Sequence, residues 1–214
     1  MRPVELLIAL LLAASFLAFA FPGRPRWLKV LPGLAFLAAL AHLLAEGPRW
    51  QMIPLYALAA LLFVFTLPVL LRPDRAARPR FWKRIAGPAA GLLLVAAAAA
   101  PPVLLPVPHA PPPAGPYRVG TFSIMLVDES RRELYSGNPD EPRRFMVQFW
   151  YPADPGPQAR TAPWTAHPEI FGPVMSRYLH FPSFFLDHVL YVGTESNLDA
   201  PLSEAQPSYP VLVY

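Results

Sequence analysis

The side chains that could act together as a nucleophile and a base lie in the second half of the chain. Ser183 precedes Asp187 and His188, which is the composition of a hydrolytic triad. Neighbours on one short helix point in different directions, so this spacing does not predict a triad. Serine hydrolases of the α/β class place the nucleophile in Gly-x-Ser-x-Gly. The sequence has no such motif, because Ser123 follows Gly120 but no glycine stands two residues after it.

Histidine and carboxylate side chains offer a second possible chemistry, a metal site. The candidate ligands are His167, Glu169, His180 and His188. Their spacing matches neither His-Glu-x-x-His nor a related pattern. The chain has no cysteine, which excludes thiolate ligands, disulfides and a cysteine nucleophile. A glycine-rich phosphate loop is also absent from the sequence. We therefore predict no catalytic, cofactor-binding or metal-binding residue, and no cofactor, within these 214 residues.

The two halves of the chain that would position such residues differ in composition. Overall, 54% of the residues are hydrophobic and 15% are charged, whereas a soluble domain carries roughly a quarter charged residues. Charge is nearly absent from Val4 to Pro108 outside three short loops, and the stretch after Tyr117 has ordinary soluble composition. The net charge of +4 reflects basic residues that flank apolar segments. This placement indicates membrane topology and argues against a nucleic-acid partner.

Four apolar segments are long enough to cross a bilayer, which takes about 20 residues in a helix. They comprise residues 4–21, 27–45, 52–71 and 85–107. The fourth is the weakest, because it is rich in alanine and Pro101 and Pro102 would break or kink it. We predict an α-helical transmembrane bundle of about four spans. Two alternatives stay open: the first segment as a cleavable signal peptide, and the fourth as an apolar stretch on the membrane surface.

Basic residues in the loops predict the orientation. The first loop holds Arg24, Arg26 and Lys29, the second holds only Arg49, and the third holds Arg72, Arg75, Arg78, Arg80, Lys83 and Arg84. Positive residues mark the cytoplasmic side. We therefore expect a multi-pass protein of the cytoplasmic (inner) membrane with its C-terminal domain on the extracytoplasmic side. If residues 85–107 do not span, that domain faces the cytoplasm instead.

We interpret the four segments as a membrane anchor. No segment carries a central ionisable residue of the kind that marks an ion path. Glu5 is near enough to the end of its segment to reach the interface. His42 lies a few residues from a helix end, and we expect it to be interfacial and to have no charged partner within the membrane.

A proline-rich linker at 108–116 leads into the polar half, and such a segment is stiff and extended. We predict strands at 117–127, ending before Asp128, and at 144–151, where nearly every residue is apolar and burial on both faces is expected. The remaining expectations are an irregular stretch at 153–173, short helices at 167–179 and at 183–191 with Ser183 as N-cap, a loop at 194–208 and a central parallel strand at 209–214.

The last predicted strand bears on whether the domain is whole. A buried strand needs hydrogen-bonding neighbours on both sides, and the sequence stops on the final residue of this one. We therefore expect residues 117–214 to be part of a larger domain.

Several tracts in the second half resemble those of a known family. They are Gly115–Gly120 (GPYRVG), Asp128, Asn138–Asp140 (NPD), Met146–Pro152 (MVQFWYP) and Tyr209–Tyr214 (YPVLVY). In this order they resemble the N-terminal part of the platelet-activating-factor acetylhydrolase family, and Tyr209–Tyr214 is similar to that family's strand before its Ser-His-Gly turn. Dienelactone-hydrolase-like enzymes share parts of the pattern. The resemblance covers residues 115–214 and not the membrane half.

The resemblance implies the start of an α/β-hydrolase domain that cleaves lipid-like or short-acyl esters. The catalytic serine, acid and histidine would then lie beyond Tyr214, and the 214 residues alone would be inactive. The expected partners are the lipid bilayer and the ester. Residues 170–191 could form a lid or an acyl-binding wall, or serve only in packing. The alternative function is a complete, non-enzymatic polytopic membrane protein with a small external binding or sensing domain.

Overall fold

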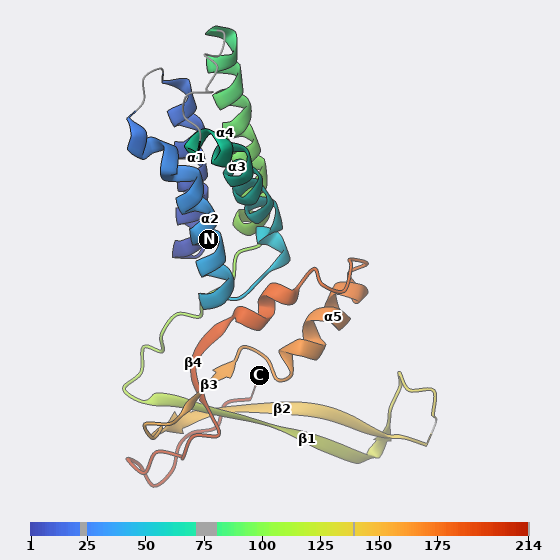
Figure 1. Ribbon diagram of the computed structural model, residues 1–214. Helices are drawn as coiled ribbons and strands as arrows, with labels where there is room; N and C mark the ends of the chain where they lie inside the picture. The colour runs from blue at the N-terminus through green and yellow to red at the C-terminus, as the bar shows by residue number, and fades with distance from the viewer. Residues whose placement is uncertain (22–24, 72–80, 139, 214) are drawn as a thin grey trace. The chain divides into compact units, whose positions relative to one another are not determined.

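A computed structural model describes residues 1–21, 25–71, 81–138 and 140–213. The chain divides into two compact units, Met1–Val107 and Pro108–Tyr214 (Figure 1). Much of the charge from which the orientation is predicted lies outside the described residues, namely Arg24, Arg72, Arg75, Arg78 and Arg80.

The first unit is helical. In its described residues, the long helices are α1 (Pro3–Ala20), α2 (Leu31–Ala45), α3 (Ile53–Leu71) and α4 (Phe81–Leu104), and short 3-10 turns at Arg26–Val30 and Trp50–Met52 precede α2 and α3. Each of the four contains or adjoins a segment that is long and apolar enough to cross a membrane. The predicted set of about four spans is therefore present as helices.

Apolar side chains cover both the inside and the outside of this helical unit. Ile8, Leu12 and Leu55 are fully buried in its core, while Leu44 and Phe65 are 89% and 74% exposed. A helix that is apolar all round is suited either to a protein core or to a membrane. The exposed leucine and phenylalanine side chains thus present a surface that lipid chains would cover.

The pair Pro101–Pro102 does not end α4. The helix continues to Leu104, and the N–H of Leu105 donates to the carbonyl oxygen of Pro101 at 2.9 Å. Proline lacks its own N–H but keeps a carbonyl that can accept. The prolines therefore do not break the helix, which ends at Leu104, and the alternative of a kink stays a prediction.

The second unit contains a small mixed sheet (Figure 1). Its described strands are β1 (Arg118–Arg132), β2 (Pro142–Ala153), β3 (Arg160–Pro163) and β4 (Gly193–Leu198), in the order β2-β1-β4-β3. β1 pairs with β2 antiparallel and with β4 parallel, and β3 pairs with β4 antiparallel. These four strands do not make up a full α/β-hydrolase sheet.

Two of the strand predictions need correction. β1 does not end before Asp128, because Asp128 still pairs with Arg143 and the strand reaches Arg132 after a shift in register. β2 is not buried on both faces: Met146 is 54% exposed and Trp150 is 58% exposed. Phe145 and Phe149, which point to the opposite face of the sheet, are each 40% exposed, so neither face of this part of β2 is fully covered.

The rest of the polar half is partly as predicted. Helix α5 (Pro168–Tyr178) confirms the helix expected at 167–179. The second expected helix is reduced to a 3-10 turn at Asp187–Tyr191, so Ser183 caps no helix. β3 and β4 form within stretches predicted to be irregular or loop.

The strand predicted at Tyr209–Tyr214 is absent from residues 209–213, the described part of that segment. Val211 and Val213 are 84% and 91% exposed instead. In the described sheet, the position beside β1 that a parallel strand would take is held by β4. Residues 209–213 pair with none of the described strands.

Candidate functional site

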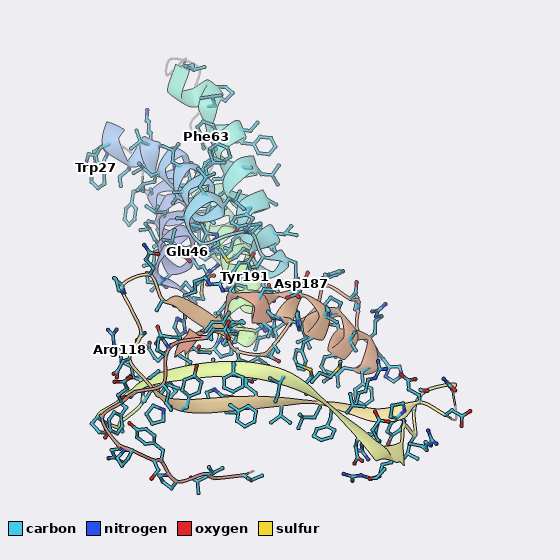
Figure 2. The ribbon with its side chains drawn as sticks, turned by 90° about the horizontal axis from the view of Figure 1, so that it is seen from below. Trp27, Glu46, Phe63, Arg118, Asp187 and Tyr191 are labelled. Carbon is cyan, nitrogen blue, oxygen red and sulfur yellow. The ribbon has the colours of Figure 1, made fainter. Side chains whose placement is uncertain are left out.

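Six polar residues gather at one end of the helical unit: Arg2, Glu5, His42, Glu46, Arg49 and Tyr56. We call this set the polar cluster. Successive helices run in opposite directions, so the start of α1, the end of α2 and the start of α3 meet at the same end. Figure 2 shows Glu46 at this end and Trp27, which precedes α2, toward the other.

Glu5 is the centre of the charge pairing. Its side chain is fully buried, and its Oε2 lies 2.6 Å from Nη2 of Arg49. The backbone N–H of Arg2 also donates to Oε2, at 2.8 Å, and Nε of Arg2 lies 3.0 Å from Oε1. Glu5 stands at the third position of α1, from which a glutamate reaches back to the residue before the helix. Local helix geometry thus sets one half of the pairing.

The two arginines connect the helices to one another. Nε of Arg2 lies 2.9 Å from Oε2 of Glu46, and its Nη1 donates to the Glu46 carbonyl at 2.8 Å. Arg49 donates from Nη1 to the carbonyl oxygen of Leu105 at 3.2 Å. Arg2 therefore ties the start of α1 to the end of α2, and Arg49 ties both to the end of α4.

His42 is fully buried and contacts residues from three helices. Its Nδ1 lies 2.6 Å from the hydroxyl oxygen of Tyr56. Its Nε2 lies 3.2 Å from Nη2 of Arg2, 3.5 Å from Oε1 of Glu5 and 3.4 Å from Oε2 of Glu46. The imidazole ring is thus enclosed by two carboxylates, a guanidinium and a phenol.

The expectation for His42 needs correction, because it has charged partners in Arg2, Glu5 and Glu46. Glu5 is buried against Arg49, and its place at the membrane interface stays a prediction. A single span gives no partner for His42, whereas the opposite directions of successive helices bring positions 2–5, 42–49 and 56 together. The sequence contained this signal, because each of these positions lies near the end of a predicted span on the same side.

The polar cluster resembles a metal site in its ligand types. Potential ligand atoms of Glu5, His42 and Glu46 lie within 4.8 Å of one another, and no other such group of three occurs among the described residues. However, Nε of Arg2 already lies within 3.0 Å of both carboxylates. Two arginines balance two glutamates, so a divalent ion would add uncompensated positive charge to a buried site. The geometry is that of an ion-pair network built around Arg2.

The candidate triad residues of the second unit lie as follows. Ser123 is within β1, opposite Gln148. Ser183 is on the exposed surface, whereas His188 is 6% exposed within the 3-10 turn. Burial raises the pKa of Asp187, and the neighbouring His188 acts in the opposite direction. These positions give no support to a catalytic triad, which the spacing of the three residues does not predict.

The candidate metal ligands of the second unit do not gather. His167 and Glu169 are neighbours, with 3.1 Å between Nδ1 and Oε1, and both are exposed. A backbone hydrogen bond and then His167 hold the pKa of Glu169 below its usual value. His180 and His188 form no group of three with them among the described residues.

A second candidate site is a polar cavity of about 350 Å³ in the second unit. Its lining residues are Pro113, Gly115–Val119, Thr161 and Thr194–Asn197. Two of the polar side chains hold the sheet together: Thr194 donates to the Ala162 carbonyl at 2.7 Å and Asn197 to the Val119 carbonyl at 3.2 Å. Sequence reasoning missed this cavity because β4, which forms one wall, was predicted to be loop.

Comparison with family models, with curated proteins and with solved structures finds no match to this chain. The resemblance to platelet-activating-factor acetylhydrolases therefore rests on the sequence tracts alone.

Proposed function

We propose that the chain is the membrane anchor and the first strands of a carboxylic ester hydrolase that resembles platelet-activating-factor acetylhydrolases. The observation that carries this proposal is the register of the β1–β2 hairpin. Val119 pairs with Pro152 and Gly120 with Tyr151. Two of the family-like tracts, Gly115–Gly120 and Met146–Pro152, thus lie side by side at one end of the hairpin.

The packing within this pair of tracts depends on their residue types. A Cβ atom at Gly120 would come within 2.5 Å of the Tyr151 ring. The Tyr151 hydroxyl in turn donates to the Ala200 carbonyl at 2.6 Å, and burial raises the pKa of this tyrosine. Gly120 and Tyr151 therefore pack against one another, which supports the proposal that the two tracts form one structural unit.

The proposal assigns the catalytic serine, acid and histidine to sequence beyond Tyr214. Further strands would pair at the free edge of β2, where Met146 and Trp150 are exposed, and with the apolar residues at 209–213. The serine would attack the ester carbonyl with histidine as the base, and backbone N–H groups would hold the oxyanion.

A lipid-like or short-acyl ester suits the surface of α5. Ile170, Val174 and Tyr178 follow one another at four-residue intervals along this helix and are 59%, 52% and 76% exposed. Residues four apart lie on the same face of a helix. This apolar stripe would form the lid or acyl-binding wall, and the four spans would hold it near a membrane-borne substrate on the extracytoplasmic side.

Fluorophosphonate labelling tests the proposal. Membranes carrying the product of the complete coding frame should be labelled on one serine, and the matched 214-residue chain should not be labelled. Absence of labelling in the complete product, or a frame that ends at Tyr214, would contradict the proposal.

The polar cavity beside β4 favours the alternative function, a non-enzymatic membrane protein with a small external binding domain. The same experiment separates the two functions, because a binding domain needs no activated serine and gives no labelling in either chain.

A further inference from the structure

The polar cavity of the second unit is bordered by two side chains of opposite charge. Arg118 and Glu195 are the only charged residues among its described lining. Both are exposed, and neither side chain forms a hydrogen bond or an ion pair with any described residue. Exposed charges add little to folding stability even when they are paired. The fold therefore leaves both groups available to a ligand.

The strand register places these two charges on one face of the sheet. The β1–β4 ladder begins with Val119 opposite Ser196. Arg118, which Figure 2 labels, and Glu195 each stand one position before that pair on their own strands. Side chains alternate between the two faces along a strand, so Arg118 and Glu195 share the face opposite to the pair. A ligand that lies across β1 and β4 on this face would contact both charges.

Three neutral polar side chains of the lining are held in place by the fold. Thr194 and Asn197 donate to backbone carbonyls of neighbouring strands. The Tyr117 hydroxyl accepts from Nε2 of Gln206 at 2.9 Å, and its ring meets that of Tyr209 edge-on, with 5.8 Å between the centroids. A fixed frame with a few uncommitted polar groups is the usual construction of a small-molecule site. The two charged side chains are the uncommitted groups here.

The volume and the charges of the cavity define a class of ligand. Its volume of about 350 Å³ is near the lower end of the range for ligand pockets, about 300–1,000 Å³, which suits a molecule of amino-acid size. A guanidinium binds a carboxylate through two parallel hydrogen bonds, and a carboxylate accepts hydrogen bonds from an ammonium group. One positive and one negative side chain add no net charge. A ligand that satisfies both is therefore neutral overall and carries both charges.

We propose that this cavity binds a small zwitterion of the amino-acid class, with its carboxylate on Arg118 and its ammonium group on Glu195. Thr161 of β3 pairs with Asn197, two positions after Glu195, and so adds a hydroxyl group on the same face. The site lies entirely within the second unit. The inference holds for an ester hydrolase and for an external binding domain alike, because the catalytic groups proposed above lie outside this cavity.

Saturation-transfer NMR on the full chain in detergent tests the site. The probe is a mixture of the neutral L-amino acids, compared with their primary amides, which lack the negative charge, and their 2-hydroxy acid analogues, which lack the positive charge. At least one amino acid should receive saturation. Its amide and its hydroxy acid should each bind about tenfold more weakly or less, because each loses a hydrogen bond between charged groups.

Variants assign the binding to the two charges. Arg118→Gln and Glu195→Gln should each weaken binding by about tenfold or more. Arg160→Gln is the matched control, since Arg160 is exposed on β3 and outside the lining, and it should bind as the parent does. An unfolding temperature equal to that of the parent shows that a variant is folded. If a variant does not fold, the comparison of analogues still decides.

Three results would each overturn the proposal: no saturation of any amino acid, equal binding of the amide or of the hydroxy acid, or unchanged binding in either folded glutamine variant. Fluorophosphonate labelling is a separate readout. Its failure bears on the ester hydrolase proposal and leaves the zwitterion site unaffected.

Discussion

At the scale of single residues, the most consequential contact is the buried ion pair between Glu5 and Arg49. The two side chains have no solvent exposure, and their closest atoms are 2.6 Å apart. Removing one partner from such a pair leaves a charge that neither water nor a counterion compensates in full. The cost of breaking the pair should therefore exceed that of any exposed ion pair in the chain.

Arg49→Met should lower the free energy of unfolding by less than the about 3–5 kcal/mol of a fully orphaned buried charge, because Nε of Arg2 still lies 3.0 Å from Oε1 of Glu5. The double variant Glu5→Gln/Arg49→Met should recover part of this loss, because it leaves no unpaired carboxylate. Thermal unfolding of the detergent-solubilised chain measures both. Arg144→Met is the matched control, since Arg144 lies 4.0 Å from Glu141 at the surface and should be nearly neutral. Equal stability of the two arginine variants would contradict the account.

Asp128 allows a pH prediction outside the membrane. Hydrogen bonds from Ser130 and then Arg131 lower its pKa from 3.8 to about 2. Because the folded-state pKa is depressed, the turn is fully stabilised above about pH 4 and loses this contribution as the pH falls through about 2. The Ser130 amide, which donates to Asp128 at 2.9 Å, should titrate near pH 2 in NMR spectra. Ser130→Ala should move the midpoint upward, and an unchanged midpoint would contradict this assignment.

At the scale of elements, the four long apolar helices and α5 were predictable, whereas the helix expected at 183–191 and the strand pairings were not. Each span is recognisable from its apolar composition over about 20 residues, and α5 confirms the helix expected at 167–179. β4 pairs with β1 across some 75 positions of sequence, and no local pattern in Gly193–Leu198 marks that partner. The Arg2–His42 and Glu5–Arg49 contacts were not predicted from the sequence for a related reason, because each joins the ends of different spans.

Helix packing offers a direct test at this scale. Gly91 of α4 faces Phe16 of α1, and a Cβ atom there would lie only 2.1 Å from Cδ1 of the ring. Gly91→Ala should destabilise the helical unit by about 1–3 kcal/mol, as overpacking does. Gly87→Ala is the matched control on the same helix, because nothing lies within 4 Å of its Cβ position and alanine favours a helix. A Gly91→Ala variant as stable as Gly87→Ala would refute this α1–α4 contact.

At the scale of the whole molecule, we propose that the helical unit is an anchor and that the β-rich unit lies outside the cytoplasm. Four helices are long and apolar enough to span, and the loop charges predict which side each end takes. An even number of spans places the residues before α1 and after α4 on the same side. The polar cluster and the start of the linker would then both face the extracytoplasmic side.

Cysteine accessibility in spheroplasts is the most direct test of this arrangement, because the chain has no native cysteine. Gly137→Cys places a thiol on the exposed loop between β1 and β2, where nothing lies within 4 Å of the Cβ position. Ala77→Cys places one in the basic third loop. A membrane-impermeant maleimide should label Gly137→Cys in intact spheroplasts and Ala77→Cys only after lysis. The reverse pattern, or labelling of both without lysis, would contradict a four-span anchor with its second unit outside.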